Sequence, residues 1–102
     1  IDLNEYLVKR PASTFLVRAA GNSMIDANIR DGDLLVVDRG IPPSNGKIVI
    51  AAVDGQLTVK FLILKKGKAF LMPANAEFAP IPVDPENGVT IWGVVTNSVH
   101  AH

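Results

Sequence analysis

The stretch KIVIAAVDGQLTVKFLIL, residues 47–64, decides the fold class. Two runs rich in β-branched residues, 47–53 and 57–64, flank the dipeptide Asp54-Gly55. β-Branched side chains suit strands, and Asp-Gly between two such runs is typical of a two-residue type I′ hairpin turn. The stretch therefore predicts a pair of antiparallel strands.

Turn signals and short apolar runs continue on both sides of this pair. The turn signals are Asp31-Gly32-Asp33, Gly40-Ile41-Pro42-Pro43, Asn45-Gly46, Lys66-Gly67 and Asn87-Gly88. The apolar runs between them are 34–37, 69–72 and 89–95. Short strands separated by turns at intervals of about ten residues are typical of all-β domains. We therefore predict an all-β fold, a single domain over residues 1–102 made of short, curved strands.

The prolines and the aromatic residues refine this prediction. Prolines cluster at 42–43 and from 80 to 85, and proline argues against strand structure in both places. We place Phe61 and Trp92 in the core, with a partner contact as the alternative for Trp92. The lysines around Gly67 are interpreted as a solvated hairpin tip.

Two segments have helical signals. Residues 2–9 can form about one turn, which the Arg10-Pro11 pair would end. Residues 23–29 are the better candidate, because Asn22 or Ser23 can cap them and an acidic residue falls in the first turn. We expect one short helix, at Ser23.

The composition excludes several classes of protein. Ten basic and ten acidic side chains cancel, so charge gives no reason to expect direct binding to nucleic acid or to a membrane surface. The chain has no cysteine, which rules out disulfides, thiolate catalysis and zinc sites built on cysteine. No apolar run approaches the roughly 18 residues that cross a bilayer, and the first residues lack the pattern of a signal peptide. A soluble intracellular domain is the expectation.

Metal and histidine chemistry are not expected either. His100 and His102 are the only histidines, and both fall within the last three residues, where chains are usually frayed. We therefore predict neither a metal site nor a Ser-His-Asp triad. Asp31 and Asp33 are interpreted as turn residues, not as a catalytic pair. Gly21 belongs to no phosphate-loop motif, and no cofactor is predicted.

Ser23 is the candidate nucleophile. It follows Ala19-Ala20-Gly21-Asn22 at the start of the expected helix. A hydroxyl in that place lies beside free backbone amides, which can stabilise an oxyanion, and the helix dipole would add to the effect. Gly21 lets the chain bend closely there. The alternative is that Ser23 only caps the helix.

Lys60 is the candidate general base, because serine needs a base and histidine is not available. A lysine with a pKa near 10.4 is neutral in only about one molecule in a thousand near pH 7.4. Burial or a neighbouring cation would lower that pKa. Lys60 interrupts an apolar run, where it shares a strand face with Thr58 and Leu62, and a lone charge there is costly unless it loses its proton. The alternative is an edge-strand lysine whose head points to water. Spacing alone does not bring Ser23 and Lys60 together.

An ordered series of segments along nearly the whole chain resembles self-cleaving serine peptidases of the LexA/UmuD type. The segments are Gly21-Asn22-Ser23-Met24, Asp31-Gly32-Asp33-Leu34, residues 46–55, Thr58-Val59-Lys60, Pro73-Ala74-Asn75, Phe78-Ala79-Pro80-Ile81 and Gly93-Val94-Val95. The separation of Ser23 and Lys60 also matches the family. The run Ala51-Ala52-Val53-Asp54-Gly55 and the lack of a DNA-binding domain favour the UmuD/MucA branch over the LexA repressors.

The resemblance implies a Ser-Lys dyad in which Ser23 is the nucleophile and Lys60 the neutral base. The backbone amides of Ser23 and Met24 would be the oxyanion donors. Family members cut their own N-terminal arm at an Ala-Gly or Cys-Gly bond after meeting RecA on single-stranded DNA. The trimmed product forms a homodimer and joins a Y-family polymerase subunit in error-prone translesion synthesis during the SOS response. The implied location is the bacterial cytoplasm, with a gene that a plasmid or another mobile element can carry.

One departure from the family pattern concerns the cleavage site. Ala20-Gly21 is the right dipeptide, but it lies within the nucleophile turn, and the first residue is not Met. We therefore expect a processed, arm-less form that keeps the dyad and has no substrate in its own chain. The alternatives are the C-terminal self-cleavage and dimerisation domain of a LexA-like repressor, and a non-catalytic dimerisation module.

Overall fold

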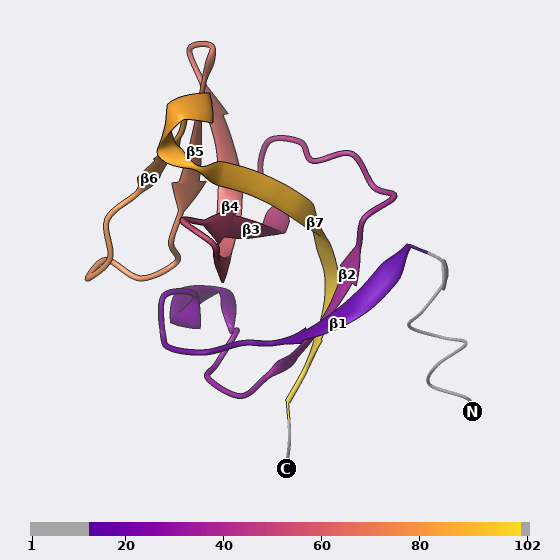
Figure 1. Cartoon of the computed structure of the whole chain (residues 1–102). Coiled ribbons are helices and arrows are strands. Elements are labelled where there is room, and N and C mark those ends of the chain that lie inside the picture. Colours follow the sequence, from indigo (N-terminus) through magenta and orange to yellow (C-terminus); the bar gives the residue numbers. More distant parts are fainter. Residues whose placement is uncertain (1–12, 101–102) are drawn as a thin grey trace.

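Seven strands form one antiparallel sheet in the part of the chain that the computed structural model describes, residues 13–100 (Figure 1). The strands are β1 (Thr14–Arg18), β2 (Leu34–Asp38), β3 (Ile48–Val53), β4 (Gln56–Lys65), β5 (Lys68–Met72), β6 (Ile81–Val83) and β7 (Val89–Val99). Two single-turn 3₁₀ helices, η1 (Ile25–Ala27) and η2 (Pro85–Asn87), lie in the connections. The predicted all-β fold is confirmed.

The strand pair predicted from residues 47–64 is present as β3 and β4. The register runs from Ile48 opposite Phe61 to Val53 opposite Gln56. The two residues between the strands have φ values of +50° for Asp54 and +82° for Gly55, as a type I′ turn requires. The hairpin fixes Lys60 opposite Val49, one position from the end of the pair that lies farthest from the turn.

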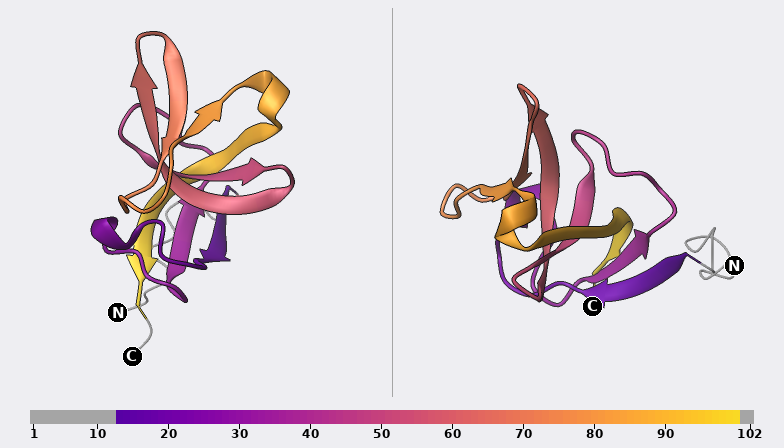
Figure 2. Two further views of the ribbon diagram at one scale, coloured as in Figure 1. Left: turned by 90° about the vertical axis from the view of Figure 1, so that its left-hand side faces the viewer. Right: turned by 45° about the horizontal axis from the view of Figure 1, so that its top comes forward.

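The strand order is β1-β2-β7-β3-β4-β5-β6, and the sheet is strongly curved (Figure 2). The long strand β7 connects the two halves, because it pairs with β2 along its second half and with β3 along its first. Register shifts interrupt both pairings, and such irregularities bend and twist a sheet. The buried side chains form two clusters; the one nearest the candidate site contains Ala19, Met24, Ile29, Leu35, Val37, Ile50 and Val59.

Two strands differ from the sequence prediction, and both lie at the edges of the sheet. β1 has no counterpart among the predicted runs, and β6 contains Pro82 in a region where strand structure was not expected. The prediction for residues 80–85 was wrong because an edge strand does not need every N–H for pairing. The absence of an N–H group on Pro82 is therefore tolerated in β6, which is the last strand of the sheet.

The predicted helix over residues 23–29 is a single 3₁₀ turn. Its N-cap is Met24, and no side chain caps it, so the prediction that Asn22 or Ser23 caps a helix was wrong. The Ser23 hydroxyl is instead in contact with Lys60. A helix of one turn has almost no macrodipole. Any oxyanion stabilisation at this place must come from individual amides.

The predictions for Phe61 and for the hairpin tip are confirmed, and the core placement of Trp92 is wrong. Phe61 packs against the core as expected, but Trp92 is 43% exposed and meets Phe15 edge to face, with the Arg39 guanidinium 5.7 Å from its ring centroid. The hairpin tip at Lys66-Gly67 is confirmed by two positive φ values. The expected helix at 2–9 lies outside the described residues.

Candidate active site

Ser23 lies on a loop that is closed at its base by the Asp-Gly-Asp segment. The Ala19 amide donates to the Asp33 carbonyl, and the Gly32 amide donates to the Ala19 carbonyl, both at 2.8 Å. Higher in the loop, the Asp31 carboxylate accepts a hydrogen bond from the Gly21 amide, also at 2.8 Å. The structural interpretation of Asp31 and Asp33 is therefore confirmed, and these residues shape the loop that carries Ser23.

Two features of the loop sequence fix its path next to Ser23. Gly21 has a φ of +81°, a conformation that strains residues with a Cβ. Met24 is only 1% exposed and belongs to the core cluster beside β3 and β4. The residues on either side of Ser23 thus hold the loop against the sheet while the serine itself stays partly exposed.

A second support comes from the turn that follows β5. The Ala74 amide donates to the Ser23 carbonyl at 2.8 Å, and the Asp26 amide donates to the Ala74 carbonyl at the same distance. The Asn75 side-chain amide donates to the Asn22 carbonyl at 2.9 Å. The Asn75–Asn22 hydrogen bond spans 53 positions of the chain, and its only sequence signal was the place of Pro73-Ala74-Asn75 in the family pattern.

The structure brings Ser23 and Lys60 together. Lys60 Nζ lies 2.7 Å from Ser23 Oγ, 2.7 Å from Thr58 Oγ1 and 3.1 Å from the Val59 carbonyl oxygen. Lys60 is only 6% exposed, and this burial lowers the pKa of its amine below the ordinary 10.5. Within residues 13–100 no carboxylate pairs with this amine. Of the two causes that the sequence left open, burial is the one present.

The three contacts of the amine match both of its protonation states. An ammonium has three donors, one for each neighbouring oxygen. A neutral amine has two donors and one lone pair. It can donate to Thr58 and Val59 while its lone pair accepts the proton of the Ser23 hydroxyl, which is the geometry that a general base needs.

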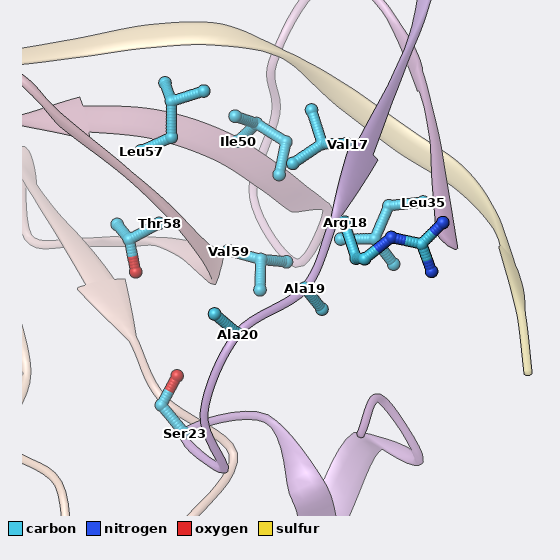
Figure 3. A pocket seen from close by; sticks show the side chains of 10 residues that line it. All are labelled: Val17, Arg18, Ala19, Ala20, Ser23, Leu35, Ile50, Leu57, Thr58 and Val59. Carbon is cyan, nitrogen blue, oxygen red and sulfur yellow. The ribbon is translucent and has the colours of Figure 1, made fainter. Parts of the chain in front are cut away.

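Next to this pair lies an open pocket of about 210 Å³ (Figure 3). Leu57, Thr58 and Val59 of β4 line one side, and residues 17–20, from β1 and its continuation, line the other. In Figure 3 the hydroxyl groups of Ser23 and Thr58 face each other. Most of the residues that line the pocket are apolar, and Ser23 is among the lining residues.

The amides expected to form the oxyanion site are unoccupied by the protein. Within residues 13–100, neither the Ser23 amide nor the Met24 amide donates to a backbone or side-chain acceptor. The carbonyls of Asn22 and Ser23, in contrast, are both hydrogen-bonded. Free amides beside the candidate nucleophile are the donors that an oxyanion would need.

His100 is not frayed, contrary to the expectation. Its Nδ1 lies 2.7 Å from Asp33 Oδ1, at the base of the loop that carries Ser23. The hydrogen bond from the Arg30 amide, supported by His100, keeps the pKa of Asp33 below its ordinary 3.8. No cluster of three or more possible metal ligands occurs among the described residues; His102 lies outside them.

Thr58 is the functional candidate to which sequence reasoning assigned no role. The strand period had placed it on the same face as Lys60, and the structure shows that its hydroxyl contacts the amine.

No helix between residues 13 and 100 is long and apolar enough to cross a membrane.

This chain is similar to one family of known proteins along most of its length. Residues 1–96 match the family described as Peptidase S24-like. MucA of Escherichia coli is 46% identical over 100% of this chain and 70% of its own length. ImpA of Shigella flexneri is 48% identical, over 98% of this chain and 68% of its own. SamA of Salmonella typhimurium strain LT2 is 47% identical, over 98% and 69%.

Proposed function

Because this chain belongs to the Peptidase S24-like family, on the UmuD-like side that includes MucA, ImpA and SamA, we propose that it is a Ser-Lys peptidase domain. Ser23 is the nucleophile and Lys60 the general base. The observation that supports this assignment most strongly is the 2.7 Å contact between a buried amine and the serine hydroxyl.

In the acylation step, the neutral Lys60 amine takes the proton of the Ser23 hydroxyl while Oγ forms a bond to the scissile carbonyl carbon. The carbonyl oxygen becomes an oxyanion, which the amides of Ser23 and Met24 stabilise. The scissile C–N bond then breaks, and the Lys60 ammonium returns the proton to the leaving amine. The product is an acyl ester on Ser23.

In the deacylation step, Lys60 takes a proton from a water molecule that attacks the ester. The C–Oγ bond breaks, and the proton passes from Lys60 to Ser23 Oγ. Both steps need Lys60 to be neutral at the start, and the low exposure of its side chain favours that state.

The biological role that fits the family is that of a UmuD-like protein. The peptidase removes an N-terminal arm after an encounter with RecA on single-stranded DNA. The processed protein acts as a homodimer and as an accessory subunit of a Y-family translesion polymerase in SOS mutagenesis, in the bacterial cytoplasm. The similarity to MucA, ImpA and SamA supports this role.

The test is cleavage in trans. A relative that carries its N-terminal arm, with its own nucleophile changed to alanine, is mixed with this chain while the pH is raised toward 10. We expect the arm to be trimmed, faster at higher pH, and trimming to stop with Ser23→Ala or Lys60→Ala in this chain. If the arm stays intact at every pH, the chain is a dimerisation module and not a peptidase.

A further inference from the structure

We propose that Asn75 is a positioning residue that aims the Ser23 amide, one of the two oxyanion donors of the site. This inference rests on the proposed function and adds to it a residue that touches neither the substrate nor the dyad. Its side chain acts through the peptide that precedes Ser23.

The geometry of the peptide unit links each carbonyl to the amide that follows it. In a trans peptide the C=O and the N–H of one unit point in opposite directions, and the unit is planar. The structure has no cis peptide among its described residues. The carbonyl of Asn22 shares a unit with the amide of Ser23, and the carbonyl of Ser23 shares one with the amide of Met24. Whatever holds these two carbonyls therefore also sets the direction of the two amides.

The turn after β5 donates a hydrogen bond to both carbonyls, and the Asn22 carbonyl also accepts a longer one, 3.3 Å, from the Ile25 amide. The Asn75 side chain donates to the Asn22 carbonyl at 2.9 Å, and the Ala74 amide donates to the Ser23 carbonyl at 2.8 Å. The carbonyls point toward residues 74–75, so the amides of Ser23 and Met24 point away from that turn. The same amides donate to no acceptor within residues 13–100 and are free for an oxyanion.

The Asn75 side chain is itself fixed in place. Its amide oxygen accepts a hydrogen bond from the Glu77 amide at 3.0 Å, while its NH₂ group donates to Asn22. A side chain held at both polar atoms has little freedom to rotate. Asn75 therefore connects the loop that carries Ser23 to the turn after β5 through hydrogen bonds at both of its polar atoms.

This turn also belongs to the part of the sheet that carries the base. β5 pairs with β4, with Met72 opposite Phe61, next to Lys60. Residues 74–75 follow β5 directly. The general base and the support of the oxyanion donors are thus attached to one strand pair, so the distance between them is set by the sheet.

Asn75→Asp is the sharpest variant, because the carboxylate keeps the acceptor for Glu77 and loses only the donor to Asn22. Asn75→Ala removes both bonds without adding charge. Asn45→Asp is the matched control, since the Asn45 side chain likewise accepts from a backbone amide, that of Leu64. The readout is the rate at which a fluorophosphonate labels Ser23, located by mass spectrometry and followed against pH. Ser23→Ala gives the background.

We expect both Asn75 variants to have a plateau rate about ten- to a hundredfold below wild type, while labelling still rises with pH as Lys60 deprotonates. Asn45→Asp should label like wild type. Comparison at the plateau separates positioning from any effect of the new charge on Lys60. Plateau rates equal to wild type in folded Asn75 variants would overturn the inference alone.

A second measurement does not depend on peptidase activity. ¹⁵N relaxation should give order parameters near the rigid value of about 0.85 for the Ser23 and Met24 amides in wild type, and a lower value for the Ser23 amide in Asn75→Asp. The Met24 amide should change less, because the Ala74 amide still holds the Ser23 carbonyl. Wild-type protein that is neither labelled nor active would refute the proposed function, and the order parameters would still decide whether Asn75 holds the amides. Equal order in Asn75→Asp and Asn45→Asp would refute the positioning role.

Discussion

Thr58 and Lys60 are two positions apart on β4, so their side chains leave the same face of the strand. The sequence predicted two features of this pair. A lysine inside an apolar run indicated a buried or neutral amine, and the strand period placed Thr58 beside it. The contact with Ser23 could not be predicted in the same way, because it joins residues far apart in the chain through the packing of a loop on a sheet.

Thr58→Val should slow the labelling of Ser23 by roughly five- to tenfold at saturating pH, the effect of losing one hydrogen bond of about 1 kcal/mol. The ammonium loses an acceptor as well, so the titration midpoint of the rate should move to lower pH. Thr58→Ser keeps a hydroxyl and should resemble wild type. Equal rates for Thr58→Val and Thr58→Ser would show that the contact has no role in positioning the amine.

The buried amine also makes stability depend on pH in a defined direction. Since burial lowers the pKa of Lys60 below 10.5, the unfolded chain binds more protons than the folded chain between the folded pKa and 10.5. The free energy of unfolding gains a contribution that increases with pH across this window. Lys60→Met has no such contribution, so its stability relative to wild type should decrease as pH rises through the window.

Urea unfolding from pH 7 to pH 11 measures this difference. Lys65→Met, at the exposed hairpin tip, is the control for loss of a lysine. If the difference between Lys60→Met and wild type stays constant with pH, burial does not perturb this amine.

Among the elements, turn chemistry predicted β3 and β4 well because Asp-Gly restricts the hairpin locally. The elements that sequence reasoning missed or misjudged depend on distant parts of the chain. β1 is paired only with β2, and β6 tolerates Pro82 because it lies at an edge. At η1, the Asp26 amide donates to the Ala74 carbonyl in the turn after β5, and the Ser23 hydroxyl just before η1 contacts Lys60 of β4.

At Gly93, strand β7 lies very close to strand β2. A Cβ at this position would lie 2.8 Å from Val37 Cγ1 and 3.1 Å from the Asp38 carbonyl oxygen. Gly93→Ala should therefore force β7 away from β2 and cost about 1–3 kcal/mol of unfolding free energy. Ser98→Ala, at an exposed position of the same strand, is the control in urea unfolding. A loss below about 0.5 kcal/mol would mean that the strands separate without strain.

For the whole molecule, β7 matters most, since it connects the half of the sheet that carries Lys60 with the half that supports the nucleophile loop. Its end reaches that loop through His100, which contacts Asp33 at the loop base. The sequence indicated a frayed end here because the two residues are 67 positions apart and no local signal joins them.

Asp33→Asn should destabilise the protein at pH 7, because an amide has one acceptor oxygen where the carboxylate has two, one of which accepts from the Arg30 amide while the other contacts His100. The pKa of Asp33 lies below 3.8 in the folded chain, so the carboxylate contributes fully above that pH and its contribution is lost as pH falls through the folded pKa. Thermal unfolding should show the variant and wild type converging in acid. Glu77→Gln is the control, and a difference that persists unchanged to low pH would contradict the assignment.

For Lys60 to act as the base, its buried amine must be neutral while it contacts the serine hydroxyl, and the titration of Lys60 measures this. The ¹³Cε resonance of Lys60, identified by its loss in Lys60→Met, can be followed by NMR as pH is raised. We predict a midpoint clearly below 10.5, which the burial of the side chain requires. A midpoint at or above 10.5 would mean that the amine keeps its proton beside Ser23 and cannot be the base.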